Sequence, residues 1–304
     1  MSRCFVARDG FAEARALYAA GENVTQGLKQ RYPDPAGWTD IIRVAYDLQS
    51  GTYVQQLGDP AVAARKAAIA ARLLSFLDGL ALGSALEAGC GEATTLVGLM
   101  QGRPDLRWSG FDLSLSRLVW ARGLLAERGC AATLFAADLA QIPLRDGAVD
   151  LVVTVHALEP NGDRAAALIG ELLRVSARYL LLVEPDYESA GEAQRARMDA
   201  HGYIRGIPAA LAAAPGRVLA RAPLGLDMNP LNAATVTLFE KATASDAPEA
   251  LPWASPGGGA PLQAVEGALF SAEVGQAWPV IGGMPYLLAD GAITASHLGR
   301  LVGG

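Results

Sequence analysis

The chain has 304 residues, 51% of them hydrophobic, and a formal net charge of −6 at pH 7. A chain of this length can bury a sizeable core and suggests about two domains. The excess of acidic residues argues against nucleic acid as a partner, because nucleic-acid-binding surfaces are usually basic. The three cysteines, Cys4, Cys90 and Cys130, are too widely spaced for a disulfide framework or a zinc site, so we expect no bound metal.

The N-terminal residues lack the long apolar core of a signal peptide. No uncharged apolar run reaches the roughly 18 residues that a membrane span needs. We therefore expect a cytoplasmic protein that does not contact membranes. The composition favours a small metabolite or a peptide as its partner.

The N-terminal part of the chain has helical patterns separated by polar residues. Apolar residues at helical spacing predict a helix over residues 11–20, and the polar residues 21–38 predict a connection. Asp40 can cap a second helix that begins at Ile41. The aromatic and amide side chains that follow either pack against this helix or face a ligand; they are Tyr46, Gln49 and Tyr53.

A glycine turn at residues 87–91 is central to the rest of the chain. An alanine- and leucine-rich helix over residues 61–80 leads into a short apolar strand that ends near Glu87. Gly89 and Gly91 follow, and then a helix-compatible run. A strand, a tight glycine turn and a helix open a nucleotide-binding α/β sheet, because glycine permits both the turn and the close approach of a ligand.

Further apolar runs end in polar residues. Strands are predicted over residues 106–111, 131–137, 149–155 and 179–183, and they are followed by Asp112, Asp138, His156 and Glu184. Asp112 comes 21 residues after Gly91, close to the spacing at which an acid reaches ribose hydroxyls. Ligands of open α/β sheets bind beyond the carboxyl ends of the strands, so we expect these residues to line one site.

Three segments resemble the first three motifs of the class I S-adenosylmethionine-dependent methyltransferases: Glu87-Ala88-Gly89-Cys90-Gly91, Gly110-Phe111-Asp112-Leu113-Ser114 and Ala137-Asp138-Leu139. The resemblance implies a doubly wound, Rossmann-like α/β sheet of seven strands with the last one antiparallel. It also implies S-adenosylmethionine as the cofactor, released as S-adenosylhomocysteine. The implied cofactor-binding residues are Glu87, Gly89, Cys90, Gly91, Asp112, Leu113, Asp138, Leu139 and Val155.

The same resemblance divides the chain into an N-terminal helical lid over residues 1–60 and a cofactor-binding domain over residues 61–243. The last two strands of the sheet are then predicted at residues 217–222 and 235–241. Alternating apolar and polar residues in the second of these predict an edge position.

A small β-rich module is expected over residues 244–304, after a linker rich in proline and glycine. The run Trp278-Pro279-Val280-Ile281-Gly282-Gly283-Met284-Pro285 resembles the zinc-ribbon proteins that activate methyltransferases. Because this part of the chain has no cysteine, we expect no zinc here. The module would pack on the catalytic domain or on a second copy in a homodimer. An unrelated β-rich extension is the alternative.

Residues beyond the fourth and fifth strands are candidates for the acceptor side of the site. His156 could deprotonate an acceptor hydroxyl or amine, because its ordinary pKa lies near neutrality, or it could only position the acceptor. The candidate substrate-binding residues are Tyr46, Gln49, Tyr53, Glu159, Glu184, Tyr187 and His201.

Together these features predict a methyltransferase that acts on a small molecule or peptide, at a hydroxyl or carboxylate oxygen, in the biosynthesis of a specialised metabolite. Nitrogen of a similar acceptor is one alternative. A non-catalytic relative that binds a partner is another, although it would not need Glu87, Asp112 and Asp138 together. Two residues argue against a nicotinamide-dependent oxidoreductase. The carboxylate of Glu87 would repel the pyrophosphate of a dinucleotide, and Thr94 stands where the dinucleotide fingerprint expects a third small residue.

Overall fold

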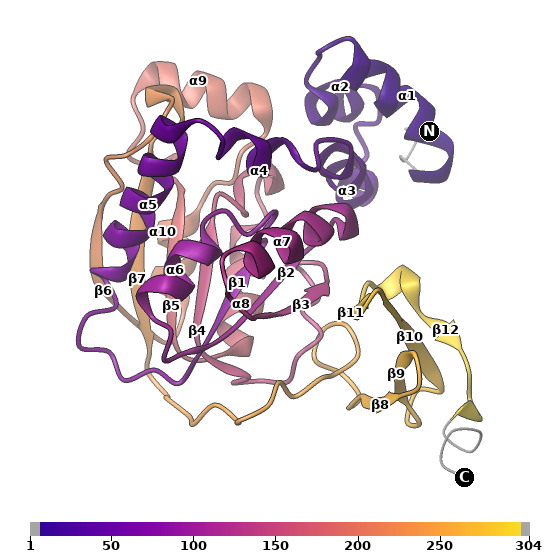
Figure 1. The fold of residues 1–304 in the computed structure, drawn as a ribbon. Helices are drawn as coiled ribbons and strands as arrows, with labels where there is room; N and C mark the ends of the chain where they lie inside the picture. Colours follow the sequence, from indigo (N-terminus) through magenta and orange to yellow (C-terminus); the bar gives the residue numbers. More distant parts are fainter. Residues whose placement is uncertain (1–6, 299–304) are drawn as a thin grey trace.

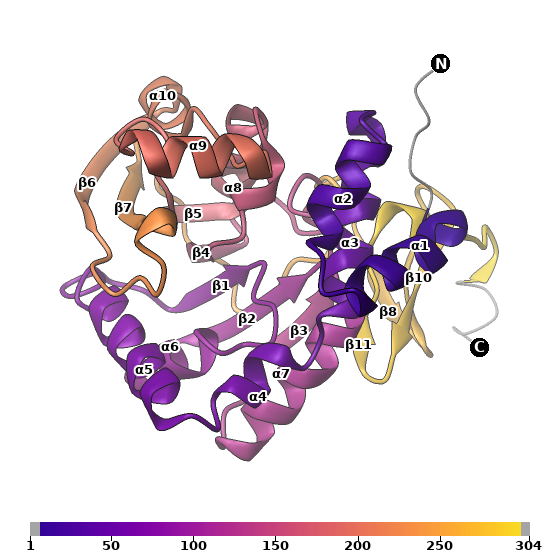
Figure 2. The same ribbon diagram turned by 90° about the horizontal axis from the view of Figure 1, so that it is seen from above.

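The computed structural model describes residues 7–298, and a seven-stranded sheet lies between two layers of helices (Figures 1 and 2). Its strands are β1 (Ser84–Ala88), β2 (Arg107–Asp112), β3 (Thr133–Ala136), β4 (Val149–Val155), β5 (Ser176–Pro185), β6 (Gly216–Pro223) and β7 (Ala234–Lys241). The strand order is β3-β2-β1-β4-β5-β7-β6, and β7 runs antiparallel to both of its neighbours. The predicted doubly wound sheet with an antiparallel last strand is confirmed.

Helices cover both faces of this sheet (Figure 2). One layer contains α5 (Pro60–Leu74), α6 (Leu96–Gly102) and α7 (Leu115–Glu127), and the other contains α8 (Ala165–Val175), α9 (Glu192–His201) and α10 (Ile207–Ala213). Val152 of β4 packs in the core that includes residues of α8, whereas Leu151 and Val153 pack in the core that includes residues of α5, α6 and α7. Burial on both faces explains the continuous apolar run of β4.

Four N-terminal helices precede the sheet: α1 (Ala7–Ala19), α2 (Val24–Arg31), α3 (Trp38–Leu48) and α4 (Thr52–Gln56). Helix α2 lies in the segment that was predicted as a connection. Its apolar periodicity is weak, and it is capped by the side chain of Asn23. Helix α3 begins earlier than predicted, so Asp40 lies in its first turn and does not cap it. Helix α5 ends at Leu74, before the predicted end at residue 80.

Strand β7 is not at the edge of the sheet, contrary to the prediction. It lies between β5 and β6, and β6, which is largely exposed, forms the edge. Thr237, the polar residue between Val236 and Leu238, is itself buried. The alternation of apolar and polar residues therefore did not mark a solvent-facing side of this strand.

A second sheet packs on the edge strand β3 of the first (Figure 1). It consists of β8 (Gln263–Val265), β9 (Ala268–Ser271), β10 (Gln276–Ile281), β11 (Met284–Pro285) and β12 (Ile293–Thr294). The backbone N–H of Leu287 donates to the carbonyl of Ala136 at 2.8 Å. Trp253, in the preceding segment, contacts Phe135 edge to face, with ring centroids 5.0 Å apart.

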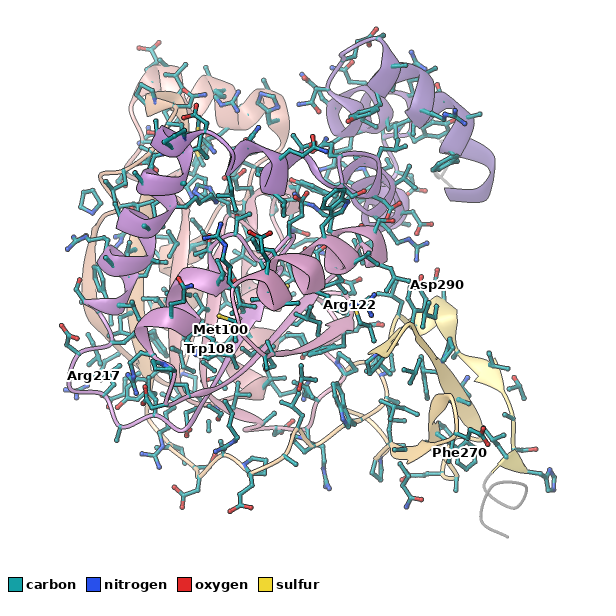
Figure 3. All side chains as sticks on the ribbon, viewed as in Figure 1. Met100, Trp108, Arg122, Arg217, Phe270 and Asp290 are labelled. Carbon is teal, nitrogen blue, oxygen red and sulfur yellow. The ribbon has the colours of Figure 1, made fainter. Side chains whose placement is uncertain are left out.

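The C-terminal sheet shares its core with the main sheet. No helix lies between β3 and β4 in the described chain. Four C-terminal residues belong to the same buried cluster as the main sheet; they are Leu262, Leu269, Trp278 and Leu287. Asp290, labelled in Figure 3, forms an ion pair with Arg43 of α3 at 2.8 Å, and Arg122 of α7 donates to the carbonyl of Gly282. The C-terminal part of the chain thus contacts the sheet, α3 and α7.

Residues 7–298 contain neither a cluster of metal-ligating side chains nor a membrane-spanning helix. No group of histidine, cysteine, aspartate and glutamate side chains in that range could hold a metal ion. No helix in that range is long and apolar enough to cross a bilayer. Cys4, one of the three cysteines for which neither a disulfide framework nor a zinc site was expected, lies outside the described residues.

Candidate functional site

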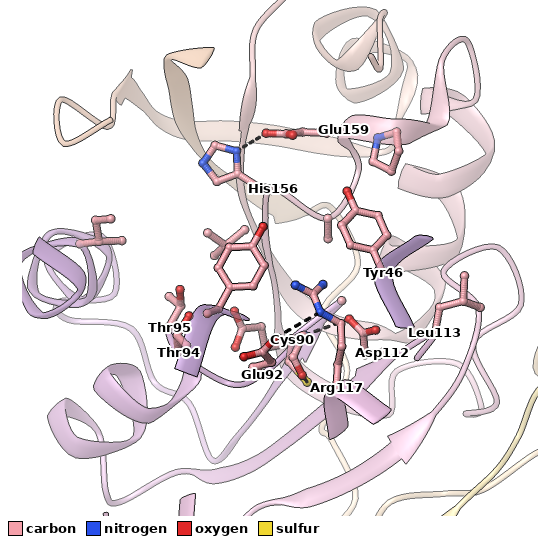
Figure 4. Close-up of a pocket in the computed structure, with 18 of the residues that line it drawn as sticks. Tyr46, Cys90, Glu92, Thr94, Thr95, Asp112, Leu113, Arg117, His156 and Glu159 are labelled. Atoms are coloured by element: carbon pink, nitrogen blue, oxygen red, sulfur yellow. Dashed lines mark hydrogen bonds and ion pairs between the residues drawn. The ribbon is translucent and has the colours of Figure 1, made fainter. Parts of the chain in front are cut away.

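A cavity of about 380 Å³ lies at the carboxyl ends of β1, β2 and β4 (Figure 4). Residues of helices α3, α4 and α5 line it as well. The cavity brings together most of the residues predicted for the cofactor and the acceptor: Tyr46, Tyr53, Glu87, Gly89, Cys90, Gly91, Asp112, Leu113, Asp138, Leu139, Val155, His156 and Glu159.

The glycine turn after β1 lets two loops approach each other closely. Gly89 has a φ of +73°, and a Cβ at this position would lie 2.5 Å from the Cβ of Ala157. Any side chain here would push the loop after β4 away from the turn. Ala93 also has a positive φ, of 59°, although it carries a Cβ. The turn therefore needs left-handed backbone at three places, and only two of them are glycine.

Glu87 lies at the end of β1 and is 2% exposed. Its Oε2 atom is buried without a hydrogen-bond partner. Burial raises the pKa of Glu87 to about 8, and the charge of nearby Lys66 only partly opposes this. A buried acceptor without a partner is costly. The ammonium group of S-adenosylmethionine would satisfy it, so the residues present fit that cofactor.

Three cationic side chains line the cavity at the end that contains Glu87, and they are Arg65, Lys66 and Arg117. Burial lowers the pKa of Lys66, and the carboxylate of Glu87 opposes that effect. A carboxylate and cations side by side suit a zwitterion such as the amino-acid end of S-adenosylmethionine.

Asp112 joins the glycine turn to the start of α7. Its Oδ2 accepts from the backbone N–H of Gly91 at 2.9 Å, and its Oδ1 accepts from the N–H of Ser114 at 2.9 Å. Burial raises the pKa of Asp112, against the charge of Arg117 and these hydrogen bonds. An ionised carboxylate can accept about four hydrogen bonds, so Asp112 keeps capacity for a ligand. Asp138 accepts from the N–H of Ala140 at 2.9 Å and also lines the cavity.

Glu92 and Arg117 were not predicted, and both connect the N-terminal helices to the glycine turn. Glu92 is 2% exposed and accepts from the backbone N–H groups of Gly51 at 2.9 Å and Val54 at 2.7 Å. It therefore caps the N-terminus of α4. The guanidinium carbon of Arg117 lies 5.0 Å from the ring centroid of Tyr46 and 4.8 Å from that of Tyr53. A charged residue within an otherwise apolar turn was the one sequence signal for Glu92.

We expect Glu92→Gln to loosen α4 over the cavity. The amide nitrogen of glutamine cannot accept, so one of the two backbone N–H groups loses its partner. Leaving one buried donor unpaired costs about 1–3 kcal/mol. Hydrogen exchange of residues 51–54 should accelerate, and affinity for S-adenosylhomocysteine should fall about tenfold, as a cost near 1.4 kcal/mol predicts.

Glu127→Gln is the matched control for this prediction, because Glu127 lies exposed at the end of α7. It should leave both the exchange rates and the affinity unchanged. Unaltered exchange of residues 51–54 in Glu92→Gln would show that Glu92 does not hold α4.

His156 lies at the end of β4 and is held by Glu159. Its Nδ1 is hydrogen-bonded to Oε1 of Glu159, and Nδ2 of Asn232 donates to the same oxygen at 3.0 Å. Burial lowers the pKa of His156, but the hydrogen bond and charge of Glu159 and the charges of Glu184 and Asp227 raise it above its ordinary value. Its φ of 55° is uncommon for histidine.

Four predicted substrate-binding residues do not line the cavity: Gln49, Glu184, Tyr187 and His201. Glu184 lies behind the loop that carries His156, where it accepts from the N–H groups of Ala157 at 3.0 Å and Leu158 at 3.2 Å. Burial raises its pKa to about 7. Tyr187 donates to Asp199 at 3.3 Å, and His201 contacts Arg197 at 2.9 Å.

Part of the chain is similar to known methyltransferases. Residues 85–178 match a family model described as a methyltransferase domain. They include β1 to β4, the glycine turn and His156.

One known enzyme is similar to part of this chain, and solved structures are similar in fold. A stretch of 94 residues is 31% identical to ajmaline N-methyltransferase from Rauvolfia serpentina, and it covers 30% of this chain and 32% of that relative. The chain thus matches about a third of that relative's length. Among solved structures, magnesium protoporphyrin IX methyltransferase from Synechocystis PCC 6803 with bound S-adenosylhomocysteine has a TM-score of 0.54 and 16% identity.

That alignment covers 66% of this chain and 98% of the Synechocystis chain. The same enzyme with bound S-adenosylmethionine aligns with a TM-score of 0.50 and 17% identity, over 67% of this chain and 96% of the other. These structural comparisons support the predicted fold.

Proposed function

We propose that this protein is a methyltransferase that moves a methyl group from S-adenosylmethionine to a small molecule. The observation that carries the proposal is the single cavity in which the strand-end acids of a methyltransferase domain meet the pair of His156 and Glu159. When bound, S-adenosylmethionine supplies a methyl group that is already activated by its sulfonium sulfur.

The chain's own residues would then bind the cofactor, align it with the acceptor and deprotonate the acceptor. Glu87 and the neighbouring cations hold the amino-acid end of the cofactor, and Asp112 and Asp138 hold its nucleoside end. Alignment of two reactants in one site can lower a barrier by about 7–11 kcal/mol. His156 accepts the proton that the acceptor loses, while Glu159 keeps the imidazole oriented.

The acceptor in this proposal is a hydroxyl or an amine rather than a carboxylate. A carboxylate has no proton for His156 to remove, and it would be repelled by Glu159 and Asp227, both of which line the cavity. The two enzymes named above are called after small molecules, ajmaline and magnesium protoporphyrin IX, which favours a small molecule over a macromolecule, and we propose that this small molecule is a specialised metabolite.

Ligand binding tests this proposal directly. Saturation at about 100 times the Kd stabilises a protein by about 2.7 kcal/mol, so the Tm should rise by several degrees with S-adenosylmethionine or S-adenosylhomocysteine. NAD should produce no shift. The proposal would be contradicted if only NAD raised the Tm, or if none of the three ligands raised it.

Glu87→Gln should weaken the binding of both adenosyl compounds more than tenfold, because a neutral amide cannot form an ion pair with their ammonium group. The unliganded protein should keep its Tm, since the pKa of about 8 leaves Glu87 mostly neutral at pH 7 and glutamine has the same shape. Calorimetry measures the affinity, with the exposed tail residue Glu266→Gln as the matched control. Equal affinity in Glu87→Gln would remove Glu87 from the site.

A further inference from the structure

The two ends of the cavity differ in charge. Of the cations that line it, Lys66 interacts with Glu87 and Glu92, and Arg117 interacts with Glu92 and Asp112, while Arg65 lies beside Lys66. The acceptor end contains His156 surrounded by carboxylates of Glu159, Glu184 and Asp227. The strongest charge effects on His156 all come from these carboxylates.

An unpaired acceptor atom lies at the same end. Because a carboxylate can only accept, the amide nitrogen of Asn232 must face Glu159, to which it donates at 3.0 Å. The amide oxygen, Oδ1, is then left buried and without a partner. Asn232 lines the cavity, so its oxygen suits a ligand that brings an N–H or O–H donor.

The rim of the acceptor end is apolar. The segment between β6 and β7 contributes Leu224, Leu226 and Met228 to the lining, and Met228 is 71% exposed. Ile42 and Tyr46 of α3 line the cavity from another element. An exposed methionine beside a cavity favours contact with an apolar ligand of variable shape.

We propose that the acceptor is an apolar amine that is methylated at nitrogen, an inference that rests on the proposed methyltransferase function. The protonated amine binds through Asp227 and Asn232, and it gives one proton to His156. The nitrogen lone pair then forms the new N–C bond, while the S–C bond breaks and its electron pair stays on sulfur. The positive charge passes from sulfur to nitrogen.

This transfer of charge is what selects nitrogen over oxygen. An amine becomes cationic as the bond forms, and the neighbouring carboxylates stabilise that charge. A hydroxyl must approach as an oxyanion, which the same carboxylates destabilise. The acidic acceptor end therefore favours the amine both in binding and in the reaction.

Three probes of similar shape test the inference: 2-phenylethylamine, 2-phenylethanol and 3-phenylpropanoate. Each is titrated by calorimetry into the full chain saturated with S-adenosylhomocysteine. We expect the amine to bind at least tenfold more tightly than the other two. Asp227→Asn should remove most of that advantage, while Asp163→Asn, an exposed acid outside the cavity, should keep it.

The inference is overturned if the amine binds no more tightly than the alcohol, or if its tighter binding survives in Asp227→Asn. In either case, binding of S-adenosylhomocysteine would leave the proposed methyltransferase function supported. Absence of S-adenosylhomocysteine binding overturns both. A methylated product of the amine, detected as a mass gain of one methyl group at nitrogen, supports both.

Discussion

His156→Asn should lower kcat for methyl transfer by about 10²- to 10⁴-fold, the usual contribution of a positioned general base. Asparagine is chosen because it tolerates the positive φ of this position, so the backbone of the loop is retained. Affinity for S-adenosylhomocysteine should change little, since the histidine acts on the acceptor. Single-turnover rates and calorimetry on the same preparation separate the two effects.

The pH dependence gives a second readout of His156. As a base it must be neutral, so kcat should rise with pH through a pKa above the ordinary value of 6.5. The groups that face His156 and raise this pKa are Glu159, Glu184 and Asp227. The raised pKa also stabilises the fold below pH 6.5, and that contribution is lost as pH rises through the folded-state pKa.

Glu159→Gln distinguishes a positioning role from a merely structural one. Without the carboxylate, the pKa of His156 falls, and the rising limb of the pH profile should move to lower pH. The maximal rate should fall as well, because glutamine holds the imidazole less firmly. A wild-type pH profile in Glu159→Gln, or an unreduced kcat in His156→Asn, would contradict the assigned base.

That the residues predicted to bind the cofactor line one cavity could be predicted from the sequence, because their signals are local. Glu87, Asp112 and Asp138 each follow a short apolar run, and parallel strands bring their carboxyl ends to the same edge. The glycine turn needs backbone angles that few residues other than glycine adopt, so Gly89 and Gly91 could also be identified from the sequence. Main strands were found for the same reason, since burial on both faces leaves long apolar runs.

The acceptor end was harder to predict because it is assembled from distant segments. Asp227 and Asn232 come from the segment between β6 and β7, and only the antiparallel return of β7 brings them to His156. Glu184 was predicted at the right strand end, but its carboxylate turns toward backbone N–H groups behind the cavity. The spacing of acids in the sequence does not tell an acid that faces the cavity from one that binds backbone N–H groups behind it.

Trp278→Ala should destabilise the whole protein by about 3–5 kcal/mol, the usual cost of truncating a buried aromatic side chain. Trp278 is 1% exposed, and its indole N–H donates to the carbonyl of Leu288 at 3.1 Å. It belongs to the same core cluster as Phe135 of β3. A loss of this size is a large part of the 5–15 kcal/mol that typically separates folded from unfolded protein.

We expect Trp278→Ala to unfold in urea in one cooperative transition that includes both sheets. Its midpoint should lie at a lower urea concentration than that of the wild type. Ile293→Ala is the matched control, because Ile293 lies in the same sheet and is 55% exposed. Its cost should stay within about 0.5 kcal/mol. Two separate transitions, with S-adenosylhomocysteine binding retained after the first, would show instead that the C-terminal sheet folds as an independent module. A single transition would mean that the C-terminal sheet folds together with the main sheet, on the side of β3 where the described chain has no helix between β3 and β4.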